Sequence, residues 1–256
     1  MPDRTTGLAV ITGAARGIGA EVALQLAEQG WSLVLADACS AQPGVAYAMP
    51  SPADLDAVAG RCGAEVLCAD VATPTFGAQL NDVLAGRRVD AAVAAAGVIA
   101  DGVAWGTDET VWSTLVDVNL HGTRRLAEAT IPGMVEAGRG RFVAISSAAA
   151  LRAMPQLAAY SAAKAAVVAF VRALAADLAG TGVLANAVCP GSTRGAMLAH
   201  SAEVYDLSHQ DEFAGQHLVR RLLEPREVAA AAVWLCGPGA SAVTGAVVPV
   251  DGGLTA

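Results

Sequence analysis

Lysine is almost absent from this chain of 256 residues. Fifteen of its sixteen basic residues are arginine, and the single lysine, Lys164, follows Ala163. A phosphate-binding P-loop requires Gly-Lys-Ser/Thr, so this class of nucleotide site is excluded. The 24 acidic residues give a formal net charge of −8. Nucleic-acid binders generally present a net basic surface and polybasic membrane anchors need clustered cations, so the composition argues against both partners.

Charged and aromatic residues are also scarce, at 16% and 4% of the chain, whereas hydrophobic residues make up 54%. An average domain carries about 25% charged residues, so this chain is suited to a large buried core and not to disorder. The uncharged stretch 228–250 is interrupted by Gly237-Pro238-Gly239. Neither half reaches the ~20 apolar residues of a membrane span, so we expect a buried helix, a turn and a buried strand there.

The five cysteines form an odd set without a Cys-x-x-Cys pair. This usage is typical of unpaired thiols in a reducing compartment. Asp3 and Arg4 lead directly into a strand pattern, without the apolar core of a signal peptide. A cytoplasmic location is therefore expected.

Short apolar runs alternate with segments of helical periodicity along the chain. Strands are predicted at 7–12, 32–37, 65–69, 91–96, 141–146, 183–189 and 246–250. Helices are predicted at about 16–29, within 75–85, at 107–118, 123–137 and 160–178, and from about 225. The strands lack polar alternation, as expected when both faces are covered, and the repeated strand–helix order predicts an α/β fold with a doubly wound parallel sheet of about seven strands. No break in composition divides the chain, so residues 1–256 are predicted to form one domain.

Two segments are longer than ordinary connections. Residues 38–53 end in Ser51-Pro52, which is typical of a helix start with a serine N-cap. Residues 191–223 follow a strand and are predicted to form a substrate lid. The apolar side chains of this segment are expected either to line a hydrophobic pocket or to pack in the core or at an interface. They are Leu198, Tyr205, Leu207, Phe213 and Leu218.

Three histidines also fall in the second long segment: His200, His209 and His217. Their spacing does not match that of a metal pair on one helix. We therefore expect solvated side chains and predict no metal site.

A glycine-rich turn, Thr12–Gly19, follows the first predicted strand and opens the first predicted helix. Glycines there permit a tight turn and let the backbone approach a pyrophosphate, which the N–H groups of the helix N-terminus would bind. The pattern predicts cofactor contacts from Gly13, Arg16, Gly17, Ile18 and Gly19.

Asp37 ends the second predicted strand. A carboxylate at that point accepts hydrogen bonds from the adenosine ribose hydroxyls and repels a 2′-phosphate, which favours NAD over NADP. Arg16 argues the other way, because a guanidinium in the glycine turn could pair with a 2′-phosphate. Asp37 is given more weight, since its carboxylate would be desolvated against that phosphate.

Tyr160 and Lys164 lie one helical turn apart on the same face of a predicted helix, between apolar flanks. Such a pair alone is also compatible with core packing and a snorkelling lysine. Ser146-Ser147 ends the preceding strand, at the edge of the sheet where α/β proteins bind ligands. Asn119 stands in the sequence Asp117–Gly122.

Together these features resemble the short-chain dehydrogenase/reductase family, and the resemblance covers the whole chain. The matching motifs are Thr12–Gly19, Asp70-Val71, Ala96-Gly97, Asn119, Ser147, Tyr160 with Lys164, Pro190-Gly191 and Asp251-Gly252-Gly253. The resemblance implies a Rossmann-type fold and a homotetramer. It also implies further cofactor contacts from Asp70, Val71, Ala96, Gly97, Pro190, Gly191 and Thr193.

The family's roles transfer to four residues. Tyr160 would be the general acid/base; free tyrosine titrates near ~10, and Lys164 with the positive nicotinamide ring would lower that pKa. Lys164 would also hold the nicotinamide ribose, and Ser147, selected over Ser146 by its spacing from the tyrosine, would orient the substrate oxygen. Asn119 would hold a water in a proton relay. The implied reaction transfers hydride between NAD and a small, apolar secondary alcohol or ketone.

Two positions depart from the family pattern. Ala94 and Ala95 replace the usual asparagines after the fourth strand, so cofactor contacts there would come from the backbone. Gly195 occupies the position of a usual threonine, so Ser192 or Thr193 would serve the nicotinamide carboxamide.

The segment Tyr47–Leu55 resembles the insert of actinobacterial mycofactocin-associated, carveol-dehydrogenase-like members of the family. In those members the insert, here within 38–53, covers the adenine side. NAD is then held almost without exchange, and an external redox carrier reoxidises it. An ordinary surface loop is the alternative.

Two further functions compete with an NAD-dependent dehydrogenase. A catalytically idle NAD-binding regulatory module is one, because a fold does not fix a function; the complete set of four catalytic residues argues against it. An NADP-dependent carbonyl reductase is the other, and Asp37 argues against it.

Overall fold

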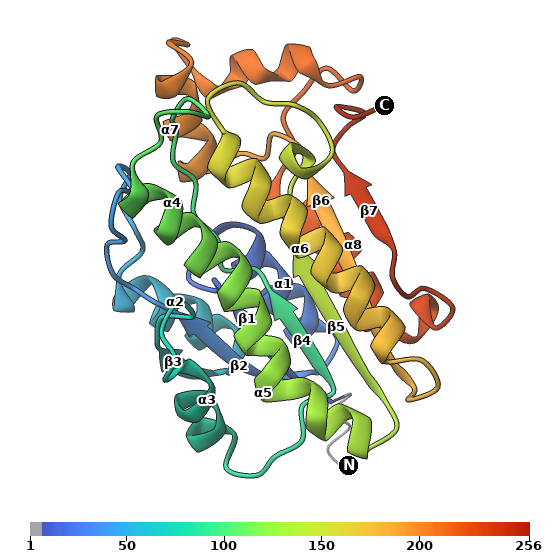
Figure 1. Ribbon diagram of the computed structural model, residues 1–256. Coiled ribbons are helices and arrows are strands. Elements are labelled where there is room, and N and C mark those ends of the chain that lie inside the picture. Colours follow the sequence, from blue (N-terminus) through green and yellow to red (C-terminus); the bar gives the residue numbers. More distant parts are fainter. Residues whose placement is uncertain (1–6) are drawn as a thin grey trace.

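The computed structural model describes residues 7–256, so Asp3 and Arg4 lie outside the described residues. Seven parallel strands form one sheet in the order β3-β2-β1-β4-β5-β6-β7 (Figure 1). The strands are β1 (Leu8–Thr12), β2 (Ser32–Asp37), β3 (Glu65–Cys68), β4 (Ala91–Ala94), β5 (Gly140–Ile145), β6 (Val183–Pro190) and β7 (Val247–Val250). The predicted doubly wound parallel sheet is confirmed.

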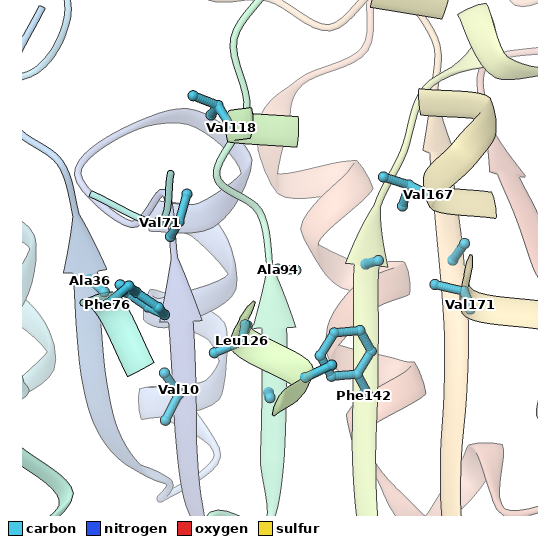
Figure 2. Packing of buried hydrophobic residues seen from close by; sticks show 14 of the residues in the cluster. Val10, Ala36, Val71, Phe76, Ala94, Val118, Leu126, Phe142, Val167 and Val171 are labelled. Atoms are coloured by element: carbon cyan, nitrogen blue, oxygen red, sulfur yellow. The ribbon is translucent and has the colours of Figure 1, made fainter. Parts of the chain in front are cut away.

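Helices cover both faces of the sheet, and alternate residues of each strand supply two separate cores. One core lies under α3 (Phe76–Leu84), α4 (Glu109–Val116), α5 (Gly122–Glu136) and α6 (Ala158–Asp177). Figure 2 shows Val10 and Phe142 in that core with Phe76, Leu126 and Val171. The other core lies under α1 (Gly17–Glu28), α2 (Pro52–Cys62) and α8 (Pro225–Cys236).

The predicted N-cap of α2 is confirmed. The Ser51 hydroxyl accepts a hydrogen bond from the Asp54 N–H at 3.3 Å, and Asp54 Oδ2 accepts one from the Ser51 N–H at 2.7 Å. This reciprocal capping box satisfies N–H groups that a helix N-terminus otherwise leaves free. It fixes the point where the 38–53 segment returns to the sheet.

The predicted break between helices at 119–122 is wrong. α4 continues into α5 through a π-helical turn, η1 (Asp117–His121), so the path is unbroken in Figure 1. Gly122, which lies in the predicted break, keeps helical angles. A Cβ there would lie 2.5 Å from Val71 Cγ2, so this glycine serves close packing and not a turn.

The uncharged stretch 228–250 forms the predicted helix, turn and strand, but the strand is not buried. β7 is an edge strand that pairs only with β6 and is half-exposed. Pro249 lies in it, as an edge strand tolerates a residue without an N–H.

Within the part of the chain that the structure describes, α6 is the one helix long and apolar enough to cross a membrane. It packs against the sheet, where Val167 and Val171 are fully buried, so we interpret it as a core helix.

The 191–223 segment contains α7 (Ala196–Val204) and a short 3-10 stretch, η3 (Gln210–Gln216). Leu198 and Phe213 are buried together there, with Tyr205 and Leu207 packed against them. Leu218 does not belong to this cluster. It is 70% exposed and lies against Gly253, so it neither lines a pocket nor belongs to the core, and interface packing stays a prediction.

Candidate active site

One cavity of about 920 Å³ opens where the parallel strands end, on the side of the sheet toward α7. The walls include the glycine turn, the end of β2 and the turn after β4. Ser147, Tyr160 and Lys164 lie in the same cavity, with the loop after β6 and α7. All catalytic residues predicted from the sequence line it except Asn119, which lies behind the turn after β4.

The glycine turn is packed too closely for side chains. Gly13 has φ +68°, and a Cβ there would lie 2.6 Å from the Ala96 backbone; a Cβ on Gly19 would lie 2.1 Å from the Gly13 oxygen. Gly17, at φ +59°, borders open space at the start of α1. Backbone N–H groups at an uncapped helix N-terminus form an anion site, so this turn fits the pyrophosphate of a dinucleotide.

Asp37 faces the same turn and is 8% exposed. Its Oδ2 accepts a hydrogen bond from the Ala15 N–H at 3.1 Å, and its Oδ1 accepts one from the Cys39 N–H at 3.2 Å. A carboxylate oxygen accepts more than one hydrogen bond, so Asp37 retains capacity for ribose hydroxyls.

Arg16 does not point freely into the cavity. Its guanidinium donates to the Ala48 carbonyl at 2.7 Å and lies 5.7 Å from the centre of the Tyr47 ring. The 38–53 segment therefore binds the Arg16 guanidinium, the cation that argued for a 2′-phosphate and so for NADP.

The cavity wall next to Asp70 is also built partly by the 38–53 segment. Gln42 is buried and donates to Asp70 Oδ2 at 2.9 Å, while Asp70 Oδ1 accepts from the Ala72 N–H at 2.8 Å. The segment thus supports Asp70-Val71, the predicted cofactor contact after β3.

The two neighbouring serines have different partners. Ser146 donates to the Lys164 carbonyl at 2.8 Å and so ties β5 to α6. Ser147 instead hydrogen-bonds the Tyr160 hydroxyl, and its oxygen accepts from the Ala149 N–H at 3.1 Å. Of the two serines, Ser147 is thus the one beside the Tyr160 hydroxyl.

Tyr160 and Lys164 are buried, at 6% and 4% exposure. The Lys164 ammonium donates to the Ile145 carbonyl at 3.0 Å and lies 5.9 Å from the centre of the Tyr160 ring. Burial raises the pKa of Tyr160 to about 12, which its hydrogen bond with Ser147 only partly offsets. Burial lowers the pKa of Lys164 to about 8.

The protein alone therefore does not give Tyr160 the low pKa expected of a base. Desolvation of the phenolate outweighs the effect of its surroundings. A further positive charge at the site would be needed to lower this pKa toward neutrality, and a bound nicotinamide ring is a charge of that kind.

Asn119 is fully buried in the π-helical turn η1. Its amide nitrogen donates to the carbonyls of Val98 and Leu115, both at 2.9 Å, and its Oδ1 accepts from the Val98 N–H at 3.3 Å. Both amide hydrogens are thus used, one to hold the chain after β4 and one to bind a carbonyl of α4. Any water in a relay would have to bind Oδ1 or the backbone.

A close approach at Gly97 brings the lysine and the asparagine together. A Cβ there would lie 2.9 Å from Asn119 Oδ1 and 3.1 Å from Lys164 Nζ. The loss of the usual asparagines at Ala94 and Ala95 is offset by Thr12, whose Oγ1 accepts from the Ala96 N–H at 3.3 Å. The turn after β4 is thus held by side chains from β1 and η1.

Tyr47 was not among the site residues predicted from the sequence. Its oxygen accepts from the Ile99 N–H at 3.2 Å, and its ring lies 5.3 Å from that of His200 on α7. The segment 38–53 thus reaches from Asp70, after β3, to α7. Two signals pointed to Tyr47: its place in the insert-like segment 47–55 and the rarity of tyrosine, with three in the chain.

The prediction of solvated lid histidines holds for His209, whose side chain is 63% exposed, and is wrong for two others. His200 is 8% exposed and His217 is 1% exposed. Their burial arises from contacts with distant segments, which local composition does not reveal.

The comparisons with known proteins agree with this site. Residues 13–255 match the family model described as enoyl-(acyl carrier protein) reductase. An uncharacterized NAD-dependent oxidoreductase of Mycobacterium tuberculosis is 33% identical over 261 residues, covering 96% of this chain and 94% of the relative. A 2-(S)-hydroxypropyl-CoM dehydrogenase of Xanthobacter autotrophicus is 34% identical over 250 residues, covering 96% and 95%.

The structure of carveol dehydrogenase from Mycobacterium avium in complex with NAD superposes with a TM-score of 0.93 at 26% identity, covering 99% of each chain. NAD, the cofactor predicted for this chain, is thus also the cofactor of these mycobacterial proteins. Motifs, fold and relatives converge on one conclusion: the chain belongs to the short-chain dehydrogenase/reductase family of oxidoreductases.

Proposed function

We propose that this protein is an NAD-dependent dehydrogenase that interconverts a secondary alcohol and a ketone, with Tyr160 as the acid/base. One observation carries the proposal: a glycine turn fitted to a pyrophosphate and the Ser147–Tyr160–Lys164 group line the same cavity. The relatives named for carveol and for 2-(S)-hydroxypropyl-CoM are both dehydrogenases of alcohols, which supports this reaction class.

The cofactor would lie along the carboxyl ends of the strands. The turn from Gly13 to Gly19 would bind the pyrophosphate, and Asp37 the adenosine ribose. The adenine would lie beside Asp70 and Val71, and the nicotinamide between Ala96-Gly97 and the segment Pro190–Thr193. Bound NAD supplies the nicotinamide carbon that exchanges hydride with the substrate.

The protein's own residues would orient the substrate and move its proton. Ser147 would hydrogen-bond the substrate oxygen beside the Tyr160 hydroxyl. In alcohol oxidation, the Tyr160 oxygen would take the hydroxyl proton as the carbon–hydrogen bond breaks. Lys164 would hold the nicotinamide ribose and keep a positive charge near the phenolate. Asn119 would fix the turn on which both depend.

The substrate side of the cavity is mostly apolar. Its walls include Met154, Leu157, Met197, Leu198 and Phe213, with the polar side chains of Arg152 and Gln216 also lining the cavity. The apolar side chains favour a small, apolar alcohol over a sugar or another polyol, because a polyol would leave hydroxyls without partners.

The alternative of an idle regulatory module gains no support from the site. A binding module has no need to bury a lysine and a tyrosine side by side, since burial of ionisable groups is costly. An NADP-dependent reductase is disfavoured because Asp37 is buried against the turn and Arg16 is engaged by Ala48 and Tyr47.

We further propose that the chain belongs to the mycofactocin-associated subgroup and acts in the cytoplasm as a homotetramer. Arg16, Tyr47 and His200 form a row of contacts that extends from the glycine turn to α7. These contacts would enclose the nucleotide, so that reoxidation by an external carrier would replace release. Trp234 on α8, 46% exposed, is available for a subunit contact.

The test begins with purified protein, whose absorbance and mass spectrum report any co-purified nucleotide. Small cyclic and branched secondary alcohols are then added without oxygen, and reduced nicotinamide absorbance is followed with and without added NAD. Reduction by an apolar alcohol in wild type, and its loss in Tyr160→Phe, is the expected result. NAD that no alcohol reduces would indicate the regulatory module, and ketone reduction only with NADPH would indicate the reductase.

A further inference from the structure

His217 lies near the end of the 191–223 segment and has no part in the proposed mechanism. Both of its ring nitrogens nevertheless have hydrogen-bond partners. The Ser192 N–H donates to His217 Nε2 at 3.1 Å. On the other side of the ring, Nδ1 lies 2.6 Å from the carbonyl oxygen of Arg221. The ring therefore connects the end of the 191–223 segment to its beginning, the loop that follows β6.

These partners define the protonation state of the ring. A backbone N–H only donates and a carbonyl only accepts, so Nε2 must be bare and Nδ1 must carry the hydrogen. With a hydrogen on Nε2, the ring N–H and the Ser192 N–H would face each other as two donors without an acceptor. His217 therefore binds Ser192 only as the neutral ring.

The loop is held at both backbone groups of Ser192. The Ser192 N–H donates to His217, and the Ser192 carbonyl accepts from the Leu223 N–H at 3.1 Å. Two residues further on, the Arg194 N–H donates to the Leu223 carbonyl at 2.9 Å. The end of the lid segment thus fixes the position of the backbone that borders the cavity.

The backbone beside His217 also contacts the 251–253 turn. The Val219 N–H donates to the Gly252 carbonyl at 3.1 Å. Gly252 has φ +60°, and a Cβ there would lie 2.7 Å from Val219 Cγ2 and 3.4 Å from His217 Cβ. A Cβ on Gly191 would lie 2.7 Å from the Asp251 oxygen, so the 190–193 loop lies against the same turn.

We propose that His217 is a positioning residue, whose neutral ring fixes Pro190–Thr193 where the loop receives the nicotinamide carboxamide. The inference rests on the proposed placement of the nicotinamide against this loop. His217 itself touches no reacting atom, and it acts through the Ser192 N–H.

Two substitutions separate the two contacts of the ring. In His217→Gln, the amide oxygen reaches the position of Nε2 and accepts from Ser192. In His217→Asn, the shorter side chain reaches the position of Nδ1, donates to the Arg221 carbonyl, and leaves the Ser192 N–H without an acceptor. Both variants remain polar and smaller than histidine, so neither overpacks the site.

Binding to nucleotide-free protein is measured by calorimetry for NAD and for ADP-ribose, which lacks the nicotinamide. We expect His217→Asn to weaken NAD binding roughly tenfold, as for one lost hydrogen bond to a buried group, and to leave ADP-ribose within about twofold. His217→Gln should stay within about threefold of wild type for both ligands. Equal losses for the two ligands, or equal losses in the two variants, would overturn the inference.

Gly191→Ala provides the control, because its Cβ must displace the same loop. If it weakens NAD selectively and His217→Asn does not, the role of His217 is wrong while the nicotinamide placement stands. If neither variant distinguishes NAD from ADP-ribose, the placement itself is wrong, and the inference falls with it.

A second readout needs no ligand. Amide hydrogen exchange of a peptide covering the 190–194 loop should be faster in His217→Asn than in wild type, and close to wild type in His217→Gln. Exchange unchanged in His217→Asn would show that the ring does not hold the loop.

Discussion

The ring of Tyr47 packs against the ring of His200, with their centroids 5.3 Å apart and their planes tilted by 37°. Tyr47 belongs to the 38–53 segment at the end of β2, and His200 belongs to α7 after β6. The 38–53 segment and the 191–223 segment, which follow different strands of the sheet, therefore meet beside the same cavity.

Removal of the Tyr47 ring should open this contact. We expect Tyr47→Ala to accelerate nucleotide dissociation by roughly 10- to 100-fold, because the ring contact, the arginine contact and the bond to Ile99 each contribute about 1 kcal/mol. Tyr47→Phe, which keeps both ring contacts, should change the rate by less than about tenfold. The measurement is the exchange of bound NAD for a fluorescent analogue. Equal dissociation rates in wild type, Tyr47→Ala and Tyr47→Phe would show that the contacts of Tyr47 do not close the site over the nucleotide.

Burial of Lys164 should make the protein less stable than it would be with an apolar residue. Its pKa falls from 10.5 to about 8, so at pH 7 the charged form costs up to about 3 kcal/mol of stability. We expect Lys164→Met to be more stable than wild type at pH 7, and inactive.

The pH dependence of this difference has a defined sign. Between pH 8 and 10.5 the unfolded chain retains the lysine proton that the folded protein has lost, so the lysine's contribution to the unfolding free energy rises with pH. The advantage of Lys164→Met should therefore shrink across that interval. Urea unfolding at pH 7 and pH 9.5 measures it, and a gap that stays constant would show that the pKa of Lys164 is not depressed.

Lys164→Arg should keep the fold and lose most of the activity. A guanidinium is planar and larger than an ammonium, so it does not fit the narrow space between the Ile145 carbonyl and Gly97. We expect at least a hundredfold fall in turnover with a circular dichroism spectrum like that of wild type. Substantial activity in this variant would mean that any cation suffices there.

Asp37→Ala should weaken NAD binding by about tenfold or more, because hydrogen bonds to a charged group contribute about 1.5–3 kcal/mol. The preference for NAD over NADP should narrow, since the carboxylate no longer repels the 2′-phosphate. Kd values for both nucleotides measure this effect. Asp56→Ala, which removes an exposed carboxylate of α2, serves as the control and should change neither value.

Much of the fold was predictable because parallel strands covered on both faces leave a clear sequence pattern. The apolar run of β1 and the glycines that follow it identify strand, turn and helix start within the first twenty residues. The continuous helical path across 119–122 was not predictable, since a glycine that permits close packing against Val71 looks the same in sequence as one that ends a helix.

The candidate site was predictable where its residues lie in local motifs, as Tyr160 and Lys164 do. Tyr47 and His217 lie in long segments without periodicity, and their partners Ile99 and Ser192 are distant along the chain. Only the folded arrangement shows that these side chains reach the cavity walls. The pKa of Tyr160 was also beyond reach, because it depends on how completely burial removes water.

The burial of the single lysine has a practical consequence. Lys164 is 4% exposed in the N-terminal half of α6, so the surface offers no lysine side chain to acylating reagents or to lysine-specific proteases. A lysine-specific protease would cut the chain at one place, and only after that central helix has opened. Its cleavage rate, compared with and without nucleotide, would report directly how strongly ligand binding restrains the opening of the core.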